Sequence, residues 1–126
     1  MRFGVVVSEW NTEITEALYE GARETLMKFG ASEEDVVRRN VPGSYELTLG
    51  AQLLAERNEF DAIICIGVVI QGETKHFDFI CEAVGQGLTN LNIKYNLPII
   101  FGGLTPNTMQ QALDRSGGVH GNKGDE

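Results

Sequence analysis

The longest apolar run of the chain covers residues 62–70 and lies between Asp61 and Gln71. It is much shorter than the roughly 18 residues that a membrane-spanning helix requires. Strands of a parallel sheet are covered by helices on both faces, so they are apolar throughout and do not alternate with polar residues. We therefore predict that residues 61–69 form the central strand of a parallel sheet.

Three further segments are typical of strands. Residues 2–8 are rich in β-branched side chains, and residues 98–103 begin with a proline and continue with apolar residues. Residues 34–41 are more polar, which favours a place near an edge of the sheet. Each of these strands is expected to be followed by a helix.

Apolar residues at helical spacing predict four helices. The first begins at Asn11 or Thr12 and is stopped by Gly30, because glycine is favoured just beyond a helix end. Ser44 is a natural cap for the second helix. The third is expected over residues 74–95 and the fourth from residue 105 onward. The glycine-rich residues 116–124 are predicted to be a loop.

Alternating strands and helices predict an α/β fold of three layers, α/β/α. Its four-stranded parallel sheet would be doubly wound, as in flavodoxin-like proteins, with right-handed crossovers. The length of 126 residues suits one such domain with its own core. Ligands of doubly wound sheets bind beyond the carboxyl ends of the strands, so the functional residues are expected there.

Composition excludes several function classes. A formal net charge of -8 argues against binding of nucleic acids and of anionic membrane surfaces. The 42% hydrophobic and 22% charged residues are those of an ordinary globular protein. Residues 1–4 lead directly into a strand, so we expect no signal peptide and a cytoplasmic protein. Cys65 and Cys81 have no CxxC spacing, and we interpret them as reduced packing residues and not as a disulfide or metal ligands.

The predicted central strand leads into a glycine turn and then into a helix. Gly72 closes the apolar run, Thr74 supplies a hydroxyl, and His76 is the first histidine of the chain. Backbone N–H groups at a helix start lack intrahelical partners and lie at the positive end of the helix dipole. An imidazole one turn into the helix could exchange protons beside a bound anion. The segment predicts a site for a phosphorylated small molecule.

Polar and aromatic residues follow the other strands as well. An aromatic residue, a carboxylate and hydroxyls are expected to meet the anion-binding turn at one rim of the sheet. They belong to residues 9–11, 43–46, 71–74 and 101–105. Such a combination is typical of a pocket that stacks one end of a ligand and binds an anion at the other.

Five motifs in this order resemble the 6,7-dimethyl-8-ribityllumazine synthase family, and the resemblance covers essentially the whole chain. Each motif alone is modest, but their order and spacing are specific. They are residues 3–8 with Trp10-Asn11, residues 41–46, residues 67–70 with His76-Phe77, residues 98–102, and residues 114–117 with residues 121–124.

The resemblance implies an enzyme that needs neither a cofactor nor a metal. The family condenses 5-amino-6-(D-ribitylamino)uracil with 3,4-dihydroxy-2-butanone 4-phosphate and forms 6,7-dimethyl-8-ribityllumazine, the penultimate step of riboflavin biosynthesis. Phosphate and water are released. Family members form homopentamers, and some assemble pentamers into icosahedral shells. They also carry a segment before the first strand and a further helix after residues 124–126, both expected to be missing here.

The resemblance also assigns roles to particular residues. Trp10 is expected to stack on the pyrimidine, and residues 43–46 to hold the ribityl chain through Ser44, Tyr45 and Glu46. Backbone groups of Val68, Val69 and Ile70 are expected at the uracil edge. Gly72, Glu73 and Thr74 would form the phosphate turn, with His76 as the proton-transfer group.

The resemblance further implies a site shared between subunits. Phe101, Arg115 and Lys123 match residues contributed by a neighbouring subunit. Arg115 is expected to bind the phosphate and to stabilise it as it departs. The expected catalytic residues are His76, Arg115 and Lys123.

Alternatives remain open at several of these positions. Glu46 and Arg115 could complement helix dipoles, Trp10 could be an apolar plug, and Lys123 could be a solvated loop cation. His76 could be a satisfied surface or core histidine. For the whole chain, the alternatives are a flavin- or lumazine-binding module without turnover and a shell-forming protein with a vestigial site.

Overall fold

The computed structural model describes residues 1–72, 75–118 and 121–125. Its centre is a parallel four-stranded sheet in the order β2-β1-β3-β4. The strands are β1 (Phe3–Ser8), β2 (Val36–Val41), β3 (Ala62–Ile66) and β4 (Ile99–Phe101). The predicted edge position of the polar strand β2 is confirmed, and so is the central position of β3.

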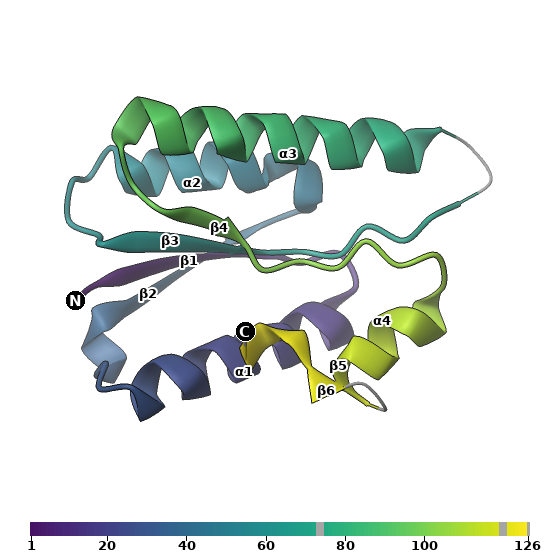
Figure 1. Ribbon diagram of the computed structural model, residues 1–126, viewed down its shortest axis with the longest axis horizontal. Helices are drawn as coiled ribbons and strands as arrows, with labels where there is room; N and C mark the ends of the chain where they lie inside the picture. The colour runs from purple at the N-terminus through teal and green to yellow at the C-terminus, as the bar shows by residue number, and fades with distance from the viewer. Residues whose placement is uncertain (73–74, 119–120, 126) are drawn as a thin grey trace.

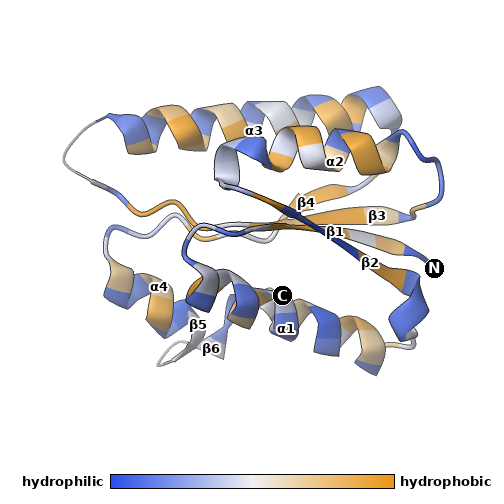
Figure 2. Cartoon of the chain, turned by 180° about the vertical axis from the view of Figure 1, so that it is seen from behind, coloured by the Kyte–Doolittle hydropathy of each residue, from blue (hydrophilic) through white to orange (hydrophobic). Residues whose placement is uncertain are grey.

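Helices cover both faces of this sheet, which confirms the predicted three-layer α/β/α fold (Figure 1). The helices α2 (Leu47–Ala55) and α3 (His76–Tyr95) lie on one face. On the other face lie α1 (Thr12–Lys28) and α4 (Met109–Arg115). Figure 2 shows apolar residues along the strands and on the inward sides of the helices, with polar residues outside.

Side chains of each strand alternate between two cores, one on each face of the sheet. Val6 and Cys65 are buried with residues of α2 and α3. Val5 and Val7 are buried with residues of α1 and with Ala112 of α4. Burial raises the pKa of the Cys65 thiol to about 12. Neither cysteine forms a disulfide. Cys65 is buried, whereas Cys81 is only half-buried.

The segment predicted as the central strand continues beyond β3, but without regular strand pairing. Regular pairing stops at Ile66, and an isolated parallel bridge then joins Val68 to Leu104. The Leu104 N–H donates to Gly67 O at 3.0 Å, and the Val69 N–H donates to Leu104 O at 2.9 Å. The apolar run therefore forms a paired segment to Val69, but not one uninterrupted strand.

Several predicted helix starts are wrong by a few residues. Ser44 does not cap α2, because a 3-10 helix (Ser44–Glu46) precedes that helix and Ser44 is buried within it. The helix α4 begins at Met109, after Thr108 accepts a hydrogen bond from the Gln111 N–H, and not at residue 105. His76 is the first residue of α3 and does not lie one turn inside it. Gly30 follows the end of α1 as predicted, with a φ of 109°.

The predicted loop over residues 116–124 contains regular structure. Strands β5 (Ser116–Gly118) and β6 (Gly121–Asn122) pair antiparallel, and a 3-10 helix (Lys123–Asp125) follows. Gly117 and Gly121 have positive φ angles of 119° and 74°, which side chains other than glycine rarely adopt. The glycines therefore make this short hairpin possible.

Within the described ranges, no helix is long and apolar enough to cross a membrane.

Candidate active site

Two hollows lie beyond the carboxyl ends of the strands, and they share no lining residue. Their volumes of about 410 and 510 Å³ are in the range of small-molecule pockets. Hollow A, the smaller, is lined by Trp10, Asn11, Gly43, Ser44, Tyr45, Glu46, Val68, Val69, Ile70, His76 and Ile80. Hollow B is lined by Ile100, Phe101, Gly102, Gly103, Leu104, Thr105, Pro106, Asn107, Gln111, Arg115 and Lys123.

The base of hollow A is held by a close contact between the turn before α2 and the end of β3. The buried Ser44 hydroxyl donates to Val68 O at 3.3 Å. A Cβ at Gly67 would lie 2.6 Å from Ser44 Oγ, so only glycine leaves room for this contact. The Ser44 hydroxyl occupies Val68 O, and Leu104 O occupies the Val69 N–H. Two of the backbone groups expected to face a uracil are therefore already engaged.

Two aromatic side chains stand at the rim of hollow A. Trp10 is 69% exposed and Tyr45 63% exposed, whereas large aromatic side chains are usually mostly buried. The Trp10 backbone is nevertheless fixed, because its N–H donates to Pro42 O at 3.1 Å. Asn11 follows in the left-handed conformation, with φ 61°. An exposed indole on a fixed backbone is suited to stacking on a planar ligand and is not an apolar plug.

The ionisable groups of hollow A are Glu46 and His76. Glu46 occupies the N-cap position of α2, where a carboxylate also interacts favourably with the helix dipole. His76 is exposed at the first position of α3 and lines the hollow together with Ile80, one turn later. A carboxylate, which can accept hydrogen bonds, and an imidazole, which can transfer protons, thus line the same hollow.

The predicted phosphate turn is described only in part. Glu73 and Thr74 lie outside the described residues. Gly72 is described and lines neither hollow, and a Cβ at this position would meet no protein atom within 4 Å. The role of this turn in anion binding therefore stays a prediction.

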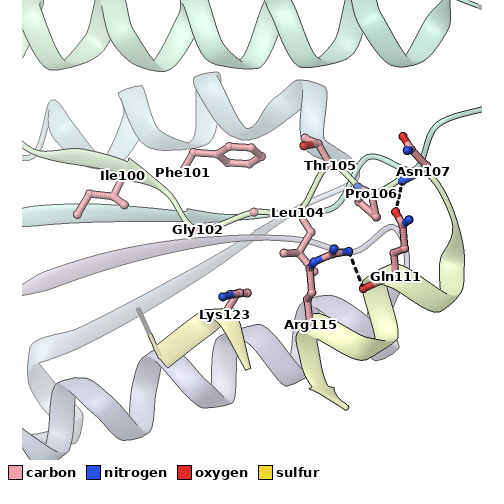
Figure 3. A pocket seen from close by; sticks show the side chains of 11 residues that line it. Ile100, Phe101, Gly102, Leu104, Thr105, Pro106, Asn107, Gln111, Arg115 and Lys123 are labelled. Atoms are coloured by element: carbon pink, nitrogen blue, oxygen red, sulfur yellow. Dashed lines mark hydrogen bonds between the residues drawn. The ribbon is translucent and has the colours of Figure 1, made fainter. Parts of the chain in front are cut away.

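Hollow B contains two cationic side chains, Arg115 and Lys123, and no acidic residue among those that line it. Arg115 is the last residue of α4, and its Nη1 donates to Gln111 O at 3.4 Å (Figure 3). The Gln111 side chain in turn accepts a hydrogen bond from the Asn107 N–H at 2.7 Å. Such a hollow attracts an anion, and a guanidinium can bind a phosphate through two parallel hydrogen bonds.

Lys123 reaches hollow B from the 3-10 helix at the end of the chain, and Phe101 from the end of β4 (Figure 3). The structure brings together the predicted uracil and ribityl residues in hollow A and the predicted neighbour residues in hollow B. Sequence reasoning missed Asn107 and Gln111, although the spacing of Gln111 and Arg115 by four residues indicates neighbours on a helix.

The family model described as 6,7-dimethyl-8-ribityllumazine synthase matches residues 1–126. The chain belongs to this family. It is 61% identical over 124 residues to a 6,7-dimethyl-8-ribityllumazine synthase of Cytophaga hutchinsonii, with 98% of this chain and 78% of that protein covered. The protein of the same name from Flavobacterium johnsoniae is 58% identical over 125 residues, with 99% and 66% covered.

A third relative, the 6,7-dimethyl-8-ribityllumazine synthase of Parabacteroides distasonis, is 56% identical over 126 residues. The alignment covers 100% of this chain and 79% of that protein. The chain thus spans from 66% to 79% of the lengths of these three relatives. The family predicted from five short motifs is confirmed.

Proposed function

We propose that the chain is a 6,7-dimethyl-8-ribityllumazine synthase that forms its active site from two copies. Hollow A of one copy binds 5-amino-6-(D-ribitylamino)uracil, and hollow B of the next copy binds the phosphate of 3,4-dihydroxy-2-butanone 4-phosphate. The observation that supports this proposal most directly is the division of the candidate residues. The aromatic, carboxylate and imidazole groups line one hollow, and both cations line the other.

Each hollow by itself lacks what the condensation needs. Hollow A has aromatic side chains for the pyrimidine and Glu46 for ribityl hydroxyls, but no arginine or lysine among its lining residues. Hollow B has Arg115 and Lys123 for a phosphate, but no group that titrates near neutral pH among the described residues that line it. Two copies placed with hollow A against hollow B supply both sets. We infer a homo-oligomer, as a pentamer or an assembly of pentamers.

The chemistry needs positioning and proton transfer more than a cofactor. The 5-amino group of the uracil attacks the ketone carbon, and loss of water leaves an imine. Elimination of phosphate leaves an enol, which tautomerises to a second ketone. Attack by the ribitylamino nitrogen on this new carbonyl then closes the ring, with further loss of water. His76 takes and returns the protons of these steps. Arg115 and Lys123 bind the phosphate and stabilise its charge as it leaves, and holding the two reactive substrates together supplies much of the acceleration.

The backbone around hollow A limits how the uracil can bind. Val68 O and the Val69 N–H already take part in hydrogen bonds within the protein. Contacts to the uracil edge therefore depend on the second lone pair of Val68 O, on the Val68 N–H and Val69 O, and on the groups of Ile70. The reduced cysteines fit a cytoplasmic enzyme.

The first test is product formation from the two substrates, followed by the absorbance of the lumazine. Product release would exclude both a binding module without turnover and a shell protein with a vestigial site. Tight binding of lumazine with no turnover by the wild-type chain would instead reject the enzymatic function.

The second test asks whether the site needs two copies. Trp10→Ala and Arg115→Ala damage different hollows, so mixed oligomers of the two variants contain some interfaces at which both hollows are intact. After unfolding and refolding an equal mixture, about a quarter of the interfaces are expected to be intact if subunits combine at random. Activity well above that of either variant alone supports the shared site. A mixture that is only as active as the mean of the separate variants contradicts it.

A further inference from the structure

The end of the described chain is attached to α1 through the side chain of Asn122. Its amide Nδ2 donates to Ala17 O, within α1, at 2.8 Å. Its Oδ1 accepts a hydrogen bond from the Gly124 N–H at 2.7 Å. One half-buried side chain therefore links the 3-10 helix Lys123–Asp125 to a helix more than a hundred residues earlier in the sequence.

Two glycines allow this attachment to be close. A Cβ on Gly21 would lie 2.7 Å from the Asn122 Oδ1, and a Cβ on Gly124 would lie 2.1 Å from Leu18 O. Both distances are shorter than side chains tolerate. Gly21 lies in the middle of α1, where glycine is less favourable than alanine. Its presence is explained by the contact with Asn122 and not by the helix itself.

Lys123 lies between Asn122 and Gly124, the residue whose N–H donates to the Asn122 side chain. It is exposed and lines hollow B, and Figure 3 shows it on the same side of the hollow as Arg115. A lysine has a flexible four-carbon stem and loses much conformational entropy when its ammonium group is held. Fixing the Lys123 backbone in advance removes the backbone part of this entropy loss.

We propose that Asn122 is a positioning residue that holds Lys123 in place for the phosphorylated substrate. The inference deepens the proposed function and rests on it. Asn122 lines neither hollow, so it acts through Lys123 and not on the substrate. The preceding strand β6 has only two residues and cannot by itself fix the segment.

A double-mutant cycle tests this role. Asn122→Ala is expected to raise the KM for 3,4-dihydroxy-2-butanone 4-phosphate about tenfold, since the two hydrogen bonds that hold the segment are lost. The KM for the ribitylaminouracil and kcat are expected to change less. In the Lys123→Ala background the same substitution is expected to change the KM by less than about twofold, because the residue through which it acts is gone.

Two further variants separate positioning from stability. Gly21→Ala improves the helix propensity of α1 but pushes Asn122 away, so it is expected to raise the same KM. Asn92→Ala is the matched control, because Asn92 makes a similar bridge: its side chain donates to Leu88 O and Ile99 O and accepts from the Ile99 N–H. Its effect on KM is expected to be equally large with and without Lys123.

An effect of Asn122→Ala that persists in full in the Lys123→Ala background would overturn the inference. A wild-type chain without product formation would reject the proposed function, but hydrogen exchange would still test the attachment. By mass spectrometry, Asn122→Ala is expected to speed the exchange of the peptide that contains Gly124. Unchanged exchange in that peptide would reject the positioning role independently of activity.

Discussion

In the proposed mechanism, His76 and Arg115 divide the chemistry between proton transfer and charge stabilisation. We expect His76→Ala to lower kcat by about 10²-fold without abolishing turnover, because water can replace a proton-transfer group in part. Arg115→Ala is expected to lower kcat/KM further, by a factor on the order of 10³, because nothing else in hollow B places a guanidinium at the departing phosphate. Steady-state kinetics on both variants decide the ranking, and the reverse order would contradict this division of roles.

At the outer edge of the sheet, Arg38 of β2 joins the Glu16 carboxylate of α1 and lies 4.4 Å from the centre of the Tyr19 ring. The hydrogen bond from Arg38 lowers the pKa of Glu16 below its ordinary 4.5. Since the folded pKa is the lower one, the stabilisation is complete above the unfolded pKa and is lost as pH falls through the folded pKa.

Glu16→Gln should therefore lower the free energy of unfolding at pH 7 by less than about 1 kcal/mol, because the pair is partly exposed. The difference from wild type is expected to shrink as the pH falls below 4.5 and to disappear at the pH at which Glu16 is protonated in the folded protein, in urea unfolding curves measured across pH. Glu24→Gln, exposed on the same helix, is the control. A difference that stays constant down to that pH would show that the ion pair is not its source.

The sequence was sufficient to predict those residues whose side-chain chemistry restricts the roles they can take. Trp10, Glu46 and His76 were expected together and line one hollow. Ser44 was expected near the site, but its predicted role as the cap of α2 is wrong. A serine after a glycine turn can either cap a helix or form a hydrogen bond with a distant strand. Only the tertiary contact with Val68 decides between these two roles. Asn122 was noted only as part of a motif, since its partner Ala17 is remote in sequence.

At the scale of elements, glycines decide how closely the helices approach the sheet. A Cβ on Gly50 of α2 would lie 2.7 Å from a methyl group of Val6 and 3.0 Å from one of Val41. Gly50→Ala is therefore expected to lower the free energy of unfolding by about 1–3 kcal/mol through overpacking. Chemical denaturation measures the change.

Gly85 of α3 is the matched control, because a Cβ there would meet no protein atom within 4 Å. Gly85→Ala is expected to raise the free energy of unfolding by about 0.5–1 kcal/mol through helix propensity alone. If both substitutions shift stability in the same direction, close packing of α2 on the sheet is not the reason for Gly50.

Elements with a continuous pattern could be predicted, and those that depend on a single contact could not. The apolar residues of β3 and the helical spacing in α1 were sufficient to place both. The hairpin β5-β6 and the 3-10 helix after it have no periodicity, because they contain two or three residues each. They form because positive-φ glycines turn the chain and Asn122 attaches it to α1.

At the scale of the whole molecule, apolar side chains remain on the outside of α2. Leu49 is 58% and Leu53 56% exposed, and the two lie one helical turn apart on one side of the helix. Exposed apolar patches of this kind often mark interfaces, and a second copy is the partner that the proposed shared site would require. We expect the double variant Leu49→Glu, Leu53→Glu to have a smaller mass in light scattering than the wild type and to lose activity with it.

Gln52→Glu provides the control, because it adds a charge to the same helix without removing an apolar side chain. It is expected to leave the mass unchanged. A double variant with the mass of the wild type would place the contact between copies elsewhere on the surface.

The bridge between Val68 and Leu104 has a consequence for such an assembly. Val68 lines hollow A and Leu104 lines hollow B, and the backbone pairing at this bridge joins the two walls directly. In the proposed oligomer these walls serve different catalytic centres. Around a closed ring, every protomer would therefore act as a rigid spacer that sets the geometry of one centre relative to the next.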